Sequence, residues 1–107
     1  MKARPVVPRE RAARDVEEAV DYLLAEAGTQ VALAFIDALE RAYAHIGANP
    51  ASGSARYAHE LGLPDARFWR VEGYRYLIFY AEQPDHIDVW RVLHAQRDLP
   101  AWMTDLP

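Results

Sequence analysis

Residues 74–99 read YRYLIFYAEQPDHIDVWRVLHAQRDL, and this stretch decides the fold of the chain. It holds two runs that are rich in aromatic and β-branched residues, Tyr74–Ala81 and Ile87–His94. Such residues favour strands, and the polar segment between them, Glu82–Asp85, includes a proline that has no N–H to give to a sheet. Nearly every residue from 76 to 80 is apolar, which is typical of a strand covered on both faces. We therefore predict that Tyr74–Ala81 is the central strand of the sheet and that Ile87–His94 pairs with it as a hairpin.

Two further strands are expected. Ala66–Val71 contains phenylalanine, tryptophan and valine, and the Glu72-Gly73 dipeptide after it predicts a tight turn, because glycine readily supplies a positive φ. Near the N-terminus, Ala3–Val7 predicts a short strand. Its proline places it at a sheet edge or at a strand start.

Between these strands the apolar period changes to three and four residues. The first stripe comprises Ala12, Val16, Ala19, Val20, Leu23, Leu24 and Ala27. It predicts an amphipathic helix from about Arg9 that stops at Gly28. The second stripe comprises Val31, Ala32, Phe35, Ile36, Leu39, Tyr43 and Ile46. It predicts a helix capped by Thr29 that ends near Pro50. The short break between the helices predicts an antiparallel helical hairpin.

The remaining segments have no apolar period. Ala51–Pro64 is expected to be a long exposed loop in which Tyr57–Leu61 can form a turn of helix. Asp98–Met103 is expected to form one or two helical turns after the last strand. The chain of 107 residues fits one domain. The expected fold class is α+β in the order β-α-α-β-β-β, with the helical hairpin packed on a small antiparallel sheet and a short C-terminal helical turn.

Composition narrows the class of function. The net charge is −4, which argues against broad electrostatic binding of nucleic acid. There is no cysteine, and the four histidines show no metal-ligand spacing, so we expect neither a metal nor a cofactor. No run approaches the roughly 20 apolar residues of a membrane span, and no signal-peptide pattern opens the chain. The sequence therefore predicts a soluble cytoplasmic protein.

The element order and two motifs carry a resemblance to a known family. The run Gly73–Tyr80, GYRYLIFY, and the later run Val92–Leu99, VLHAQRDL, resemble the ParE branch of the ParE/RelE toxin superfamily. The likeness extends over nearly the whole chain, and the tail motif is its most specific part. It implies the toxin of a type II toxin–antitoxin system that inhibits DNA gyrase by binding it. It also implies neutralisation by a ParD-like antitoxin, with which the toxin forms a hetero-oligomer.

Two other functions stay open at this point. The related RelE branch cleaves mRNA on the ribosome with basic residues on the sheet and a C-terminal aromatic residue or histidine. Against this activity stand the acidic balance, the single lysine, and a C-terminal segment that has no tyrosine. A toxin-fold protein that has lost its activity and only binds an antitoxin is the third interpretation. We favour a binding inhibitor over a nuclease.

Gyrase binding and mRNA cleavage predict different sets of functional residues. Those expected to face the target are His94, Arg97, Trp102 and Met103. They place large apolar residues beside polar ones near the C-terminal end, as interfaces commonly do. The nuclease alternative would use Arg67, Arg75, Arg91 and His94. For each of these arginines taken alone a structural role is the stronger interpretation, because arginines commonly extend from a sheet edge or form ion pairs. For His94 a structural role is also the stronger interpretation, because no second catalytic group lies at a matching spacing.

Overall fold

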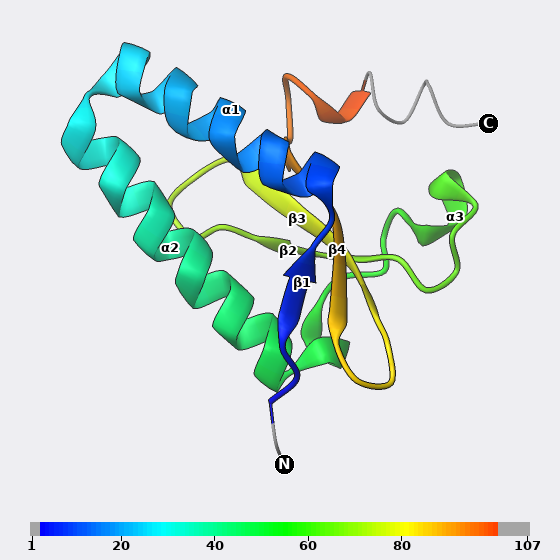
Figure 1. Ribbon diagram of the computed structural model, residues 1–107. Helices are drawn as coiled ribbons and strands as arrows, with labels where there is room; N and C mark the ends of the chain where they lie inside the picture. Colours follow the sequence, from blue (N-terminus) through cyan, green and yellow to red (C-terminus); the bar gives the residue numbers. More distant parts are fainter. Residues whose placement is uncertain (1–2, 101–107) are drawn as a thin grey trace.

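The structure is a computed structural model that describes residues 3–100. Its strands and its two long helices are β1 (Val6–Pro8), α1 (Glu10–Ala27), α2 (Thr29–Ala48), β2 (Arg67–Arg70), β3 (Tyr76–Glu82) and β4 (Ile87–His94). A 3₁₀ turn, η1 (Pro50–Ser52), and the single-turn helix α3 (Ala58–Leu61) lie in the loop between α2 and β2. The predicted order β-α-α-β-β-β is confirmed (Figure 1). The predicted C-terminal helical turn begins at Leu99, and its continuation to Met103 lies outside the described residues.

The sheet has the strand order β1-β4-β3-β2. β3 lies between β4 and β2 and is antiparallel to both, so the prediction of a central strand is confirmed. β1 lies at the edge and pairs in parallel with β4, with Val6 opposite Ile87, so the sheet is mixed rather than purely antiparallel. The predicted turn between β2 and β3 is also present. The Tyr74 N–H donates to the Val71 carbonyl across it, and Gly73 has the expected positive φ of 86°.

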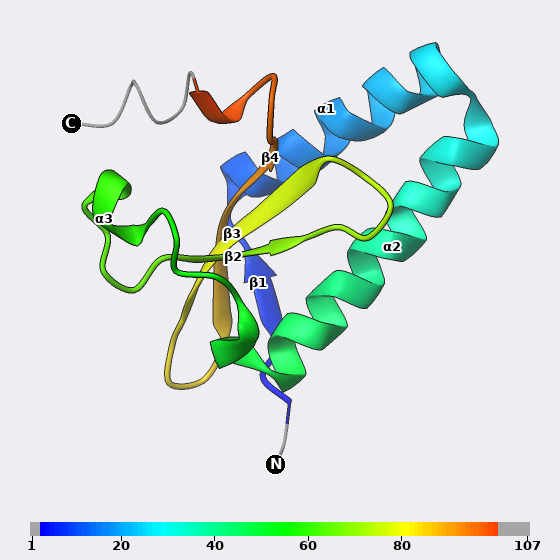
Figure 2. The same cartoon turned by 180° about the vertical axis from the view of Figure 1, so that it is seen from behind.

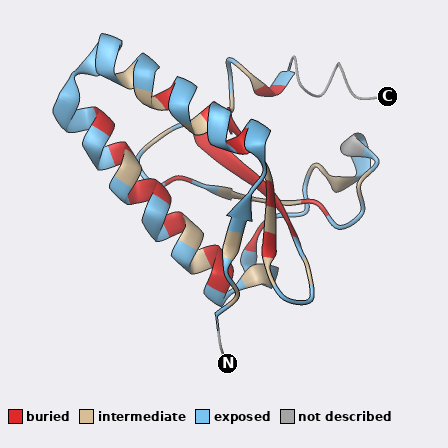
Figure 3. Ribbon diagram, in the orientation of Figure 1, coloured by how far each residue is buried: buried red, intermediate tan, exposed pale blue. Residues whose placement is uncertain are grey.

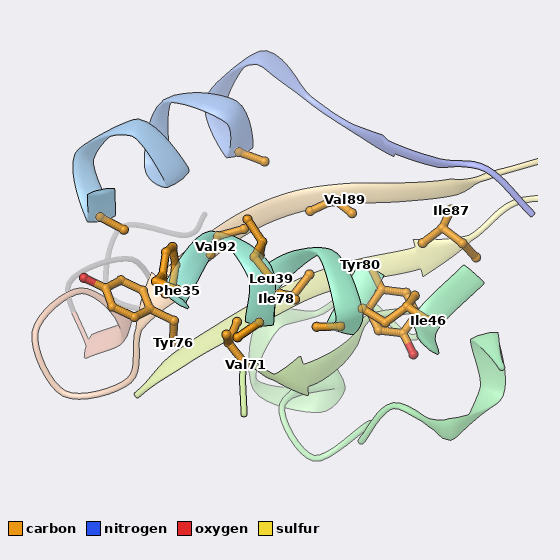
Figure 4. Close-up of a cluster of buried hydrophobic side chains, with 14 residues drawn as sticks. Phe35, Leu39, Ile46, Val71, Tyr76, Ile78, Tyr80, Ile87, Val89 and Val92 are labelled. Atoms are coloured by element: carbon orange, nitrogen blue, oxygen red, sulfur yellow. The ribbon is translucent and has the colours of Figure 1, made fainter. Parts of the chain in front are cut away.

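The apolar residues of β3 serve two cores, one on each face of the sheet. Tyr76, Ile78 and Tyr80 belong to the cluster that the helices cover, whereas Leu77 and Phe79 belong to a second cluster on the other face. Because side chains alternate along a strand, a continuous apolar run fills both faces. Figure 4 shows the first cluster, in which Phe35, Leu39 and Ile46 of α2 lie over the sheet residues. Figure 3 shows the buried residues of both helices on the side toward the sheet.

The two long helices form the predicted hairpin on one face of the sheet. They meet beside Gly28 and diverge over the strands (Figure 1). The Gly28 N–H donates to the carbonyl of Leu23, which closes the end of α1. Thr29 is the first residue of α2 rather than its cap, and no side chain caps this helix. The prediction that Thr29 caps α2 is therefore wrong: with only Gly28 between the helices, that glycine serves as the flanking residue of both.

The second face of the sheet is covered by the loop before β2 and by the end of the chain. Tyr57, Leu63 and Leu99 pack against the cluster formed with Phe79. The loop that carries α3 extends beside β2 in both views (Figures 1 and 2). Its first part is fixed by Tyr80, whose hydroxyl donates to the Pro50 carbonyl and accepts the N–H of Gly53. A Cβ atom at Gly53 would overlap that hydroxyl, so the approach requires glycine.

Candidate functional site

The predicted target-facing surface begins where β4 ends, in the segment His94–Leu99, which we name the C-terminal turn. His94 pairs with Tyr76 of β3, and the Asp98 N–H donates back to the His94 carbonyl at 3.0 Å. The Ala95 N–H donates to the carbonyl of Arg75. These backbone bonds fold the chain over the ends of β3 and β4, so that the residues of the tail motif gather at this end of the sheet.

His94 acts within this turn as a hydrogen-bond acceptor. Its Nδ1 atom accepts the N–H groups of Gln96 at 3.2 Å and Arg97 at 3.0 Å. An acceptor nitrogen carries no proton, so these bonds require the neutral ring with its proton on Nε2. Burial, together with the nearby Arg97 charge, lowers the pKa of His94, and Asp98 opposes the shift only partly. His94 is therefore held neutral near physiological pH, and Nδ1 is already used by the backbone.

Arg97 connects the C-terminal turn to both the helix layer and the sheet. Its guanidinium lies 4.5 Å from the ring centroid of Tyr22 on α1 and donates to the Tyr76 hydroxyl of β3 at 3.1 Å. Its Nε atom also donates to Asp98, and this bond raises the pKa of Arg97. Burial alone would raise the pKa of Asp98, but the bonds from Arg97 and the His94 N–H outweigh it and lower that pKa.

The other two predicted target-binding residues, Trp102 and Met103, lie outside the described residues. The chain just before them is well anchored, because Leu99 is buried in the second core cluster.

The nuclease candidates lie on different elements and bind different groups. Arg67 donates to the Gly53 carbonyl at 2.8 Å, Arg75 donates to Gln96 at 2.7 Å, and Arg91 is held by Asp15 at 2.8 Å. Along β3, Arg67 is opposite Tyr80, whereas His94 is opposite Tyr76. The structure brings Arg75 and Arg97 to His94, and it places Arg67 and Arg91 farther along the sheet.

Asp15 is a structural residue that the sequence analysis missed. It is only 4% exposed, and its carboxylate accepts both Nε and Nη2 of Arg91 and, in addition, the N–H of Val92. β1 pairs with β4 only as far as Val89. Beyond that residue Asp15 of α1 takes the place of a strand and accepts the hydrogen bond of the Val92 N–H. The signal was present, since Asp15 stands three residues after Ala12 and four before Ala19 within an apolar stripe.

Comparison with known proteins now decides the family. Residues 6–99 match the family described as the ParE toxin of the type II toxin-antitoxin system parDE. The chain belongs to the ParE toxin family. As a ParE toxin, it is one component of a type II toxin–antitoxin system, as the tail motif indicated.

Solved structures agree with the ParE fold. The chain is similar to a chain from a structure described as the chromosomal ParDE TA system from P. aeruginosa, with a TM-score of 0.73 and 16% sequence identity. That match covers 88% of this chain and 98% of the other. A comparison with curated protein sequences gives no match. Within residues 3–100, no helix is long and apolar enough to cross a membrane.

Proposed function

We propose that this ParE toxin inhibits DNA gyrase by binding it and that a ParD-like antitoxin neutralises it. Membership of the ParE family supports both parts. The observation that favours binding over chemistry is the state of His94, whose Nδ1 atom accepts two backbone N–H groups. A general acid or base needs a nitrogen that is free to exchange a proton with the substrate and a pKa near the working pH. The lowered pKa of His94 and its place in the turn fit a structural role better.

We further propose that the target contacts the C-terminal end through Arg97, Trp102 and Met103, with His94 fixing the turn that presents them. The Arg97 guanidinium is partly exposed, and its bonds to Tyr76 and Asp98 hold it in one orientation. Arginine and tryptophan are both enriched among the residues that contribute most to binding at interfaces, and the two stand close together in this part of the sequence.

Deletion of Trp102–Pro107 tests the location. The truncated toxin should no longer inhibit supercoiling by purified gyrase, while its thermal midpoint and its affinity for the antitoxin stay nearly unchanged. A matched control lacks only Asp105–Pro107 and keeps the tryptophan and methionine; it should inhibit like the full chain. If the longer deletion lowers stability and antitoxin binding together, the segment is structural and the target site lies elsewhere.

The nuclease alternative keeps one favourable observation, the gathering of Arg75 and Arg97 around His94. A ribosome-dependent mRNA cleavage assay, run beside the supercoiling assay, separates the two activities. Cleavage by the parent protein that is lost in His94→Ala and Arg75→Ala, with gyrase unaffected, would replace our proposal. A protein that is inert in both assays yet binds the antitoxin would match the third interpretation, an inactive toxin-fold protein.

A further inference from the structure

Tyr22 of α1 is an exposed aromatic residue that core packing does not explain. Its side chain is 47% exposed and belongs to neither core cluster. Its ring instead meets the other end of the chain, because the Arg97 guanidinium lies 4.5 Å from its centroid. A guanidinium within about 6 Å of an aromatic ring is attracted by the electrons of the ring face. The ring of Tyr22 therefore packs on the C-terminal turn rather than on the core.

The sequence of α1 places this ring on the helix face that contacts β4. Asp15, Ala19 and Tyr22 stand at steps of four and three residues, so they share one face of the helix. Asp15 binds Arg91 of β4, and Ala19 is buried in the first core cluster. Tyr22 comes next along this face and meets the C-terminal turn, which lies beside α1 in both views (Figures 1 and 2). One face of α1 thus contacts both β4 and the segment that follows it.

Three side chains hold the Arg97 guanidinium and leave one of its nitrogens over. Nη2 donates to the Tyr76 hydroxyl at 3.1 Å, and Nε donates to Asp98 at 3.1 Å, while the Tyr22 ring lies against the group. Within residues 3–100, Nη1 makes no hydrogen bond, and the Arg97 side chain is 41% exposed. The two N–H donors of Nη1 are therefore available to an acceptor outside this chain.

Tyr22 differs from the other two side chains because it serves no other contact of this kind. Tyr76 is buried in the first core cluster, with its ring 5.1 Å from that of Phe35. Asp98 also accepts the His94 N–H, which closes the C-terminal turn. The Tyr22 hydroxyl, in contrast, forms no hydrogen bond with any residue from 3 to 100. Its ring is thus the part of the arrangement that orients Arg97 without also building the core or the turn.

We propose that Tyr22 is a positioning residue of the target-binding site: its ring holds the Arg97 guanidinium so that Nη1 binds a carboxylate or carbonyl oxygen of the target protein. The proposal rests on the proposed function, since it takes Arg97 as a residue that contacts the target. An arginine that is already fixed loses less conformational entropy when it binds. Because the ring makes the contact and the hydroxyl does not, phenylalanine should replace Tyr22 without loss.

The orientation of Arg97 can be measured without any target. The ring current of Tyr22 shifts the NMR signals of the Arg97 Hδ and Hε protons in the isotope-labelled full chain. Tyr22→Leu should move these signals toward those of a solvent-exposed arginine, and Tyr22→Phe should keep them in place. The matched control is Leu24→Ala, because Leu24 is a similarly exposed residue of the same helix, at 43%, and lies outside both core clusters. Unchanged Arg97 signals in Tyr22→Leu would overturn the proposal.

Binding to immobilised gyrase tests the effect on the target. Tyr22→Leu should weaken the affinity about fivefold to thirtyfold, the range of a cation–π contact at exposed and at desolvated sites. Tyr22→Phe and Leu24→Ala should bind like the parent. In an Arg97→Gln background, Tyr22→Leu should cause little further loss, because the ring then has no guanidinium to hold. Circular dichroism confirms that each variant is folded at the assay temperature.

The outcomes separate this proposal from the proposed function. An equal loss from Tyr22→Leu with and without Arg97 would show that Tyr22 acts on its own, and a loss in Tyr22→Phe as large as in Tyr22→Leu would assign the effect to the hydroxyl; either result overturns the positioning role. A parent protein that neither binds nor inhibits gyrase would refute the proposed function instead. The NMR comparison alone would then decide whether Tyr22 orients Arg97.

Discussion

Replacing Asp15 by alanine should lower the free energy of unfolding far more than replacing an exposed residue does. The Asp15 side chain is buried, and its carboxylate accepts three hydrogen bonds, two from Arg91 at 2.8 and 3.0 Å and one from the Val92 N–H at 3.0 Å. Its loss removes the carboxylate that binds the Arg91 guanidinium and leaves the buried Val92 N–H without its acceptor. Breaking a buried pair from one side costs about 3–5 kcal/mol. Arg91 is 18% exposed, and water can partly replace the carboxylate, so we expect about 3 kcal/mol.

Urea denaturation followed by circular dichroism measures this cost. Glu18→Ala is the matched control on the same helix, because Glu18 also faces an arginine, at 3.4 Å, but its side chain is 65% exposed. The control should lose less than about 1 kcal/mol. Adding Arg91→Met to Asp15→Ala should restore part of the lost stability, since the uncompensated charge is then removed as well. A cost below about 1 kcal/mol for Asp15→Ala, or strictly additive effects in the double variant, would refute this account of the pair.

Three further predictions concern the sheet and the C-terminal turn. The pKa of His94 lies below its ordinary value of 6.5 in the folded protein, so its contribution to stability is present above about pH 6.5 and is lost as the pH falls below that value. The thermal midpoint of the parent should therefore fall more between about pH 7.5 and pH 5 than that of His94→Asn; parallel pH curves would disprove it. Phe79→Ala and Leu77→Ala should each cost about 2–5 kcal/mol in urea denaturation, with the fully buried phenylalanine nearer the upper end. Less than about 1 kcal/mol for both would mean that the second core contributes little. Gly73→Ala should cost about 1 kcal/mol through its positive φ of 86° alone, because an added Cβ would meet no atom within 4 Å; an unchanged midpoint would argue against the turn.

The sequence was most informative where one pattern had one structural solution. An apolar run that fills both faces of a strand fits a central position, so β3 could be placed in the sheet. Two apolar stripes separated by a single glycine likewise fit a hairpin. The parallel partner of β1 could not be predicted, because three residues have no turn or period that specifies a strand many residues away. The exact first residue of α2 could not be predicted either. Thr29 is a residue type that commonly caps helices, but it is the first residue inside this one.

The candidate site was predictable in location but not in arrangement. The tail motif pointed to His94 and Arg97, and both lie in the C-terminal turn. Their partners come from distant parts of the sequence, because Tyr22 lies on α1 and Tyr76 on β3. A structural role for His94 was preferred from the sequence, and the fold adds which backbone groups its ring binds and that Arg97 joins the helix layer to the sheet. Asp15 could have been predicted from the sequence, since a carboxylate in an apolar stripe needs a buried partner.

The parallel pairing of β1 with β4 has a consequence for how the protein is made. β1 leaves the ribosome well before β4, the strand it pairs with, which begins at Ile87. Contacts between residues so far apart in the sequence form slowly, because the intervening chain must be closed into a loop first. The helical hairpin can form early, but the strands that cover its apolar face are synthesised after it. We therefore expect a nascent chain to stay incompletely folded until β4 is available, and a message cut before the codon for Ile87 to yield only an unfolded, harmless fragment.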